Sequence, residues 1–219
     1  MFLLISFAIA CILAIVLHGT TRRFVRNRLV SEAAARAASA LGRAGELFPL
    51  VSRVAALAWA ARAGAAVTSL DEVGDWVLLT TPPGDAAARL AKFVQHTGIL
   101  ISSRQADAYL APERRHVGAP PAPVQAALAP YLAGVAPADI LLATSGMNAV
   151  AAAIAAVDAV QRPRGRRAWI QLGWLYVDST RLLEKAADAP HHFVADVRDL
   201  AAVERLLAAG DVAGVLTEL

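Results

Sequence analysis

Apolar and polar residues follow two different spacings along this 219-residue chain, and each spacing predicts a kind of element. In the first half, helical spacing with start and stop residues predicts helices over Ser31–Gly42, Pro49–Gly64, Asp85–Val94 and Val124–Ala133. One short apolar run, Asp75–Thr80, lies between glycine and proline residues and predicts a strand. A hydroxyl-rich loop, Gln95–Arg104, leads into a further helix that begins near Gln105. The first half therefore mixes helices and strands.

The second half shows a more regular alternation. The run Ile140–Ala143 predicts a strand that turns at Thr144-Ser145-Gly146 into a helix over Met147–Val160. Beyond it, strands are expected over Ala168–Leu172, His192–Val194 and Gly214–Thr217, with helices over Asp178–Ala187 and Asp199–Ala209 between them. Strands separated by helices of about a dozen residues favour parallel βαβ units, which bind ligands at the carboxyl ends of their strands.

The Ser145-Gly146 turn carries candidate chemistry. The first N–H groups of a helix have no partner within the helix, and together with the helix dipole they favour an anion such as phosphate. Ser145 adds a hydroxyl, and Gly146 permits close approach of a ligand to the backbone. The alternative is an ordinary N-cap serine before a packing glycine, and spacing alone leaves both interpretations open.

Aromatic and imidazole side chains lie near the ends of the strands predicted after this turn. Tyr176, in Gly173-Trp174-Leu175-Tyr176, lies where it could stack on a planar ring, although a core tyrosine with a satisfied hydroxyl is the commoner arrangement and is favoured by the residues alone. His191 and His192 would point to opposite faces of a strand, and no carboxylate or cysteine is suitably spaced to join them. A metal site is therefore not predicted.

The N-terminal segment has a different character. Met1–Leu17 contains no charged side chain and is just long enough to cross a bilayer, so residues 1–21 are a candidate transmembrane helix. The arginines that follow would keep the bulk of the protein on the cytoplasmic side. A cleaved signal peptide is disfavoured, because no positive side chain precedes the apolar run and no small-residue cleavage site follows it. A buried helix or a misassigned start remains the alternative.

Composition excludes several classes of protein. The formal charge is +3, and the arginine clusters at residues 22–28 and 162–167 are not interleaved with aromatic residues as in a nucleic-acid interface. A single cysteine, Cys11, excludes an internal disulfide framework. The proline-rich segment Pro120–Pro123 predicts a rigid connector. The expected organisation is residues 1–21, an N-terminal α/β region over 22–110, and a ligand-binding domain over 111–219.

Several motifs together resemble one enzyme family. Three motifs carry most of the resemblance: Thr144–Ala149, Leu175–Thr180 and Val215–Glu218. Two further motifs precede them, Phe93–Gly98 and Ile101–Asp107. With this spacing, the stretch from Arg23 to Leu219 is similar to the cystathionine γ-synthase branch of the pyridoxal-phosphate enzymes of trans-sulfuration (Cys/Met metabolism).

The resemblance implies an α/β fold: the three-layer sandwich of the type I pyridoxal-phosphate (aspartate aminotransferase-like) large domain, incomplete at the C-terminus, with a helical N-terminal region. The implied cofactor is pyridoxal 5'-phosphate. The backbone of Ser145, Gly146 and Met147 would hold its phosphate, Tyr176 would stack on its ring, and Glu218 would begin the next cofactor-side segment. The implied reaction replaces the γ-substituent of an activated homoserine by a cysteine thiol, with the cofactor as electron sink. A small amino-acid substrate and a homo-oligomer follow from the same resemblance.

Two residues that the family needs for turnover are missing. The aspartate that pairs with the pyridine nitrogen and the Schiff-base lysine would lie beyond Leu219. The two lysines present, Lys92 and Lys185, lie on predicted helices and do not replace the latter. The sequence is therefore expected to be a fragment or truncated product that is inactive alone, with no catalytic residue of its own.

Two other functions are alternatives to this one. A membrane-anchored, non-catalytic α/β domain could retain the phosphate cradle as a binding or structural feature. A nucleotide-binding module is disfavoured, because Thr144–Asn148 has neither the Gly-x-Gly-x-x-Gly spacing nor a Gly-Lys-Ser/Thr ending.

Overall fold

The computed structural model describes residues 27–114, 121–132, 134–186 and 190–218. These residues divide into two compact units. Residues 121–142 form the smaller unit, and residues 27–114 together with 143–218 form the larger one. The predicted membrane segment, Met1–Leu17, lies outside the described residues. Within the described ranges, no helix combines the length and the apolar character that crossing a membrane requires.

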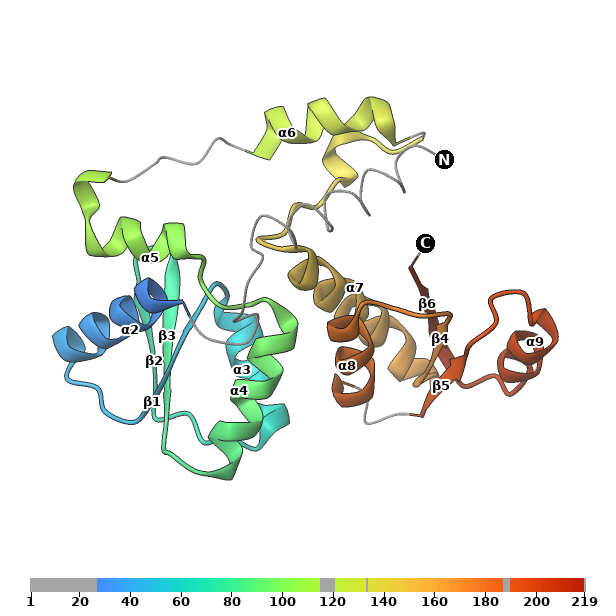
Figure 1. Ribbon diagram of the computed structural model, residues 1–219, viewed down its shortest axis with the longest axis horizontal. Coiled ribbons are helices and arrows are strands. Elements are labelled where there is room, and N and C mark those ends of the chain that lie inside the picture. Colours follow the sequence, from blue (N-terminus) through green and yellow to red (C-terminus); the bar gives the residue numbers. More distant parts are fainter. Residues whose placement is uncertain (1–26, 115–120, 133, 187–189, 219) are drawn as a thin grey trace. The chain divides into compact units, whose positions relative to one another are not determined.

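The first sheet of the larger unit is antiparallel, with the strand order β1-β3-β2 (Figure 1). Val73 pairs with Trp76 across the two-residue turn Gly74-Asp75, and Gly74 takes the φ of +65° that such hairpin turns require. The strand predicted over Asp75–Thr80 is thus confirmed within one residue. The three strands are β1 (Glu46–Leu50), β2 (Ser69–Val73) and β3 (Trp76–Thr81).

Helices cover both faces of this sheet, so every residue of the central strand β3 is buried. Because successive side chains of a strand point to opposite faces, Trp76 and Leu78 pack with one pair of helices, and Val77 and Leu79 with the other. The first pair is α2 (Arg28–Leu41) and α5 (Ser103–Leu110), and the second is α3 (Arg53–Ala63) and α4 (Asp85–Thr97).

The second sheet of the larger unit is parallel, with the order β5-β4-β6. It confirms the parallel βαβ units predicted after Val160. A long helix, α7 (Gly146–Gln161), precedes it. The strands and their crossover helices are β4 (Ala168–Leu172), α8 (Val177–Ala186), β5 (His191–Val194), α9 (Leu200–Ala208) and β6 (Val212–Thr217).

Helices α7 and α8 lie on one side of the parallel sheet, where Ile154, Trp169 and Leu183 form the centre of its core. Figure 1 shows α9 on the other side. This placement follows from the strand order: the chain moves from β4 to one edge and then from β5 across β4 to the other edge. Two right-handed crossovers in opposite directions put their helices on opposite faces. The carboxyl end of β4 leads into residues 173–176, and that of β6 leads to Glu218.

The smaller unit contains short helical segments. Gln125 Nε2 donates a hydrogen bond to the carbonyl of Ile140 at 2.7 Å. The helix here begins at Pro121 and not at Val124 as predicted, because proline is tolerated in the first turn, where no N–H partner is needed. The segments are α6 (Pro121–Leu128) and the 3-10 turns η2 (Ala129–Tyr131) and η3 (Pro137–Asp139); two further 3-10 turns, η1 (Pro112–Arg114) and η4 (Arg162–Arg164), belong to the larger unit.

The strand predicted over Ile140–Ala143 is wrong. These residues are irregular, and Leu141 is 90% exposed. A strand forms only where a neighbour accepts and donates its ladder hydrogen bonds, and none of the described strands pairs with this run. The helix that follows is confirmed, but it is entered from an irregular segment and not from a strand.

Other predicted boundaries also moved. Pro49 belongs to strand β1, and α3 begins only after Ser52, whose Oγ accepts a hydrogen bond from Ala55 N at 3.3 Å. Helix α2 begins after Asn27 instead of Ser31. The predicted loop Gln95–Arg104 is in part helical, since α4 continues to Thr97 and α5 starts at Ser103. The predicted division into three segments and the predicted family fold stay predictions.

Candidate cofactor site

Ser145 is the N-cap of helix α7. Its Oγ accepts a hydrogen bond from Asn148 N at 3.1 Å, and its carbonyl accepts one from Ala149 N at 3.0 Å. The N-cap interpretation of Ser145 is therefore confirmed. Capping by Ser145 leaves two N–H groups of the first turn without a partner: those of Gly146 and Met147 have no acceptor within the described part of the chain.

The entrance to α7 is open in front of these N–H groups. Ser145 and Gly146 are exposed, and a β-carbon placed on Gly146 would meet no atom within 4 Å. Unpaired N–H groups at the positive end of a 16-residue helix are a suitable environment for a phosphate. The residues present thus fit an anionic cofactor group at this turn.

Gly98 supports the turn from behind. It ends helix α4 with a φ of +62°, and a β-carbon there would lie 3.0 Å from Asn148 N, 3.3 Å from Met147 Cβ, and in overlap with Ser145 Oγ. Only glycine allows this approach, both for its backbone angle and for the space. The end of α4 and the start of α7 are therefore in direct backbone contact.

A buried hydrogen bond joins the same end of α4 to helix α8. His96 Nδ1 lies 3.0 Å from Asp178 Oδ1, and the two residues are 7% and 9% exposed. Asp178 is in the first turn of α8. His96 is thus hydrogen-bonded, and it is helical and buried although it falls in the segment predicted as the loop Gln95–Arg104. A buried polar side chain needs such a partner.

Tyr176 lies at the start of α8 and is half-buried. Its N–H donates to Glu218 Oε2 at 2.5 Å, and the other oxygen, Oε1, accepts from Ser179 Oγ at 2.6 Å. A carboxylate from the end of β6 therefore caps the N-terminus of α8, where the helix dipole favours negative charge. The sequence placed Glu218 near the cofactor but did not reveal this contact.

The last turn of α4 supports both parts of the predicted site. Gly98 packs against the Ser145 turn, and His96 binds Asp178, two residues beyond Tyr176. Sequence reasoning missed this support, although a glycine directly after His-Thr at the end of an amphipathic run is a helix-stop signal. Lys92 is exposed on α4, away from the buried end of that helix.

His191, one of the two adjacent histidines, contacts the turn after β4. His191 Nε2 lies 3.1 Å from Gln171 Oε1, and Gln171 Nε2 donates to the carbonyl of Gly173 at 3.1 Å. Burial lowers the pKa of His191 below its ordinary value, with a smaller opposing effect from Glu184. His191 thus orders the turn after β4 through Gln171.

Comparison with known proteins gives one informative similarity. The chain is 42% identical over 211 residues to an L-2-amino-4-chloropent-4-enoate dechlorinase/desaturase of Streptantibioticus cattleyicolor. The match covers 90% of this chain and 42% of that enzyme, so the chain spans less than half the length of the dechlorinase/desaturase. No family model matches the chain, and no solved structure matches it. The dechlorinase/desaturase is named for an amino-acid substrate, whereas its name does not refer to trans-sulfuration.

Proposed function

We propose that this chain forms part of a pyridoxal-phosphate-dependent enzyme that removes a substituent from the γ-carbon of an L-amino acid. The observation that carries the proposal is the open N-terminus of α7, with the N–H groups of Gly146 and Met147 available and Gly98 fixing the turn. The resemblance of the surrounding motifs to pyridoxal-phosphate enzymes and the similarity to an amino-acid dechlorinase/desaturase support it.

Each predicted residue has a task in this proposal. The N–H groups of Gly146 and Met147 bind the cofactor phosphate, with Ser145 Oγ at the edge of the turn. Tyr176, whose N–H donates a hydrogen bond to Glu218, would stack on the cofactor ring. When bound, pyridoxal phosphate supplies an electron sink that stabilises negative charge on the substrate carbons. The Schiff-base lysine would lie in the part of such an enzyme that this chain does not span.

Two reactions share the γ-leaving group. Trans-sulfuration replaces the γ-substituent of an activated homoserine by a thiol, as the cystathionine γ-synthase resemblance implies. In L-2-amino-4-chloropent-4-enoate the chlorine is on the fourth carbon, which is the γ position, and the relative is named for dechlorination and desaturation. Thiol consumption marks the first reaction, and chloride release without a thiol marks the second. A homo-oligomer and an amino-acid substrate remain part of the proposal.

Binding of pyridoxine 5'-phosphate tests the phosphate site directly. This probe has the ring and phosphate of the cofactor but no aldehyde, so it does not react with lysine side chains. We expect binding that Gly146→Pro weakens by about 10- to 150-fold, since a hydrogen bond to a charged group contributes about 1.5–3 kcal/mol. Proline removes the N–H yet suits the first helical position, where Ser145 is already extended.

Gly146→Ala is the matched control, because it keeps the N–H and adds a methyl group into open space. Tyr176→Leu should weaken pyridoxine phosphate while leaving inorganic phosphate unaffected, and Tyr176→Phe should change neither. Calorimetric titration measures all four variants. Equal affinities of Gly146→Pro and Gly146→Ala, or no binding of the probe at millimolar concentration, would remove the basis of the proposed function.

A further inference from the structure

The turn between β4 and α8, residues 173–176, is attached to both strands beside β4. At its start, the N–H of Gly173 donates to the carbonyl of Val194 in β5 at 2.8 Å. At its end, the N–H of Tyr176 donates to the carboxylate of Glu218, directly after β6. Since β5 and β6 flank β4 in the sheet, the main chain that carries the Tyr176 ring is held from two sides.

Glu218 binds the start of α8 through both of its carboxylate oxygens. Oε2 accepts from the Tyr176 N–H at 2.5 Å, and Oε1 accepts from the hydroxyl of Ser179 at 2.6 Å. Ser179 is 1% exposed, so the second contact is anchored in the interior. Hydrogen bonds to a charged oxygen are about twice as strong as those between neutral groups. One side chain therefore fixes the place of the Tyr176 main chain.

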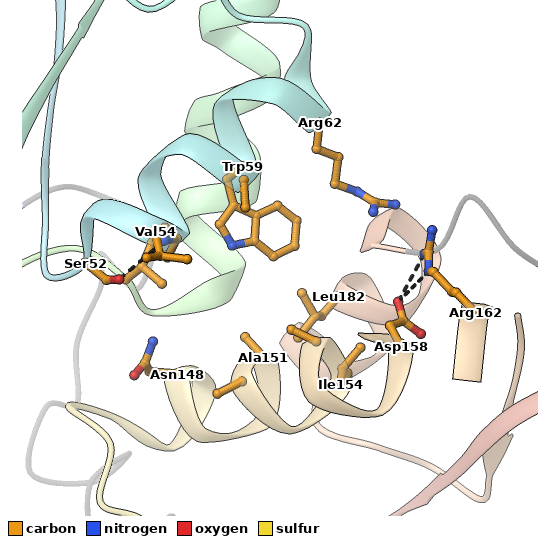
Figure 2. A pocket seen from close by; sticks show the side chains of 15 residues that line it. Ser52, Val54, Trp59, Arg62, Asn148, Ala151, Ile154, Asp158, Arg162 and Leu182 are labelled. Atoms are coloured by element: carbon orange, nitrogen blue, oxygen red, sulfur yellow. Dashed lines mark hydrogen bonds and ion pairs between the residues drawn. The ribbon is translucent and has the colours of Figure 1, made fainter. Parts of the chain in front are cut away.

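The rest of α8 is fixed by contacts that do not involve this carboxylate. Leu182 is buried and packs in one core with Ile154 of α7, and both side chains line the pocket in Figure 2. The side chain of Asp178 is bound to α4. Loss of Glu218 should therefore release Tyr176 while the helix behind it stays in place.

The N-termini of α7 and α8 differ in charge. Helix α8 has Asp178 in its first turn and the Glu218 carboxylate bound at its start, whereas the first turn of α7 contains no acidic residue. The positive end of α8 is thus already paired with an anion of the chain itself. A ligand phosphate is expected at α7, which leaves Tyr176 to an uncharged part of the ligand.

We propose that Glu218 is a positioning residue of the cofactor site, which fixes the main chain of Tyr176 so that the ring is presented to the cofactor. Glu218 acts through Tyr176 and does not itself bind the ligand. This inference rests on the proposed function, because it concerns the same site. The contact that carries it is nevertheless measurable without a ligand.

NMR with ¹⁵N-labelled tyrosine measures the contact in the ligand-free chain. The chain has three tyrosines, and Tyr176→Phe identifies the signal of Tyr176. We expect slow hydrogen exchange of this amide in the parent chain and in Glu218→Gln, whose side-chain oxygen still accepts a hydrogen bond. In Glu218→Ala the exchange should be at least about tenfold faster. Equal exchange in the three chains would overturn the inference, whether or not the chain binds the cofactor.

Titration with pyridoxine 5'-phosphate and with inorganic phosphate measures the consequence for binding. Glu218→Ala should weaken pyridoxine phosphate about 3- to 12-fold, the range of one aromatic stacking contact, and leave inorganic phosphate unchanged. Glu218→Gln should stay within about twofold of the parent, because it can keep both hydrogen bonds. In a Tyr176→Leu background, Glu218→Ala should have no further effect. Circular dichroism checks that each variant folds.

The outcomes distinguish this inference from the proposed function. A loss caused by Glu218→Ala that persists in the Tyr176→Leu background, or that is equal for inorganic phosphate, would overturn the positioning role and leave the phosphate site intact. Binding that depends on Gly146 but not on Glu218 would do the same. No binding of pyridoxine 5'-phosphate by the parent chain would instead remove the proposed function and this inference with it.

Discussion

Substitution of Gly98 by alanine measures how tightly α4 holds the start of α7. Gly98 and Gly42 end helices α4 and α2 with nearly the same left-handed backbone, at φ +62° and +64°. Alanine costs about 1 kcal/mol at either position for the backbone alone. At Gly42 a β-carbon meets nothing within 4 Å, whereas at Gly98 it overlaps Ser145 Oγ and lies 3.0 Å from Asn148 N. Gly42→Ala is therefore a control matched in backbone conformation.

The overlap at Gly98 adds a packing cost that the control lacks. Forcing extra volume into a packed contact costs about 1–3 kcal/mol, so Gly98→Ala should lower the free energy of unfolding by about 2–4 kcal/mol and Gly42→Ala by about 1 kcal/mol. Because Ser145 must move, Gly98→Ala should also weaken pyridoxine 5'-phosphate several-fold, and Gly42→Ala should not. Urea unfolding and calorimetric titration provide the two measurements. An equal loss of stability in both variants would refute the inferred contact.

Two further predictions concern polar pairs of the larger unit. His96→Leu and Asp178→Leu should each cost about 1–3 kcal/mol in urea unfolding, because each removes the buried hydrogen bond between the two side chains, and the double variant should cost less than the sum of the single losses. Additive losses would show that the two side chains do not interact. Hydrogen bonds from Arg43, at 2.7 and 2.9 Å, lower the pKa of the Asp71 carboxyl group. The pair therefore stabilises the fold at pH values above the ordinary carboxyl pKa, and this stabilisation is lost as the pH falls through the lowered pKa of Asp71. Arg43→Gln should raise the pKa of Asp71 in an NMR titration and reduce the acid-induced loss of stability, and an unchanged pKa would exclude Arg43 as the cause.

Elements with local start and stop signals could be predicted from the sequence. Helix α9 has the N-cap Asp199, whose carboxylate accepts from Ala202 N, and its predicted limits are correct within one residue. Strand β1 was missed because Pro49 and its neighbours resemble a helix start, while their actual partners are residues of β3 about thirty positions away. The apolar run Ile140–Ala143 shows the opposite error, since hydrophobicity without a partner strand does not make a strand.

At the proposed phosphate-binding turn, Ser145–Met147, local contacts could also be predicted from the sequence and distant ones could not. Ser145 was identified because an N-cap bonds within three residues. The role of α4 was not, because its apolar pattern describes only the face that packs on the first sheet, with Ala87, Leu90 and Val94. His96 lies roughly half a turn from that face, where the pattern predicts exposure, and it is buried against Asp178 instead. A polar pair forms this second interface, and hydrophobic periodicity does not detect such pairs.

Helix α4 therefore connects the two sheets of the larger unit through opposite faces. One face is fixed by the apolar core under β3, and the other ends in His96 and Gly98, which contact α8 and α7. Since both contacts come from a single helical turn, a displacement of α4 moves the Ser145 turn and the start of α8 together. The relative position of the proposed phosphate donors and Tyr176 is thus set by the contacts of His96 and Gly98 in the last turn of α4, and substitutions of these two residues should alter the proposed cofactor binding.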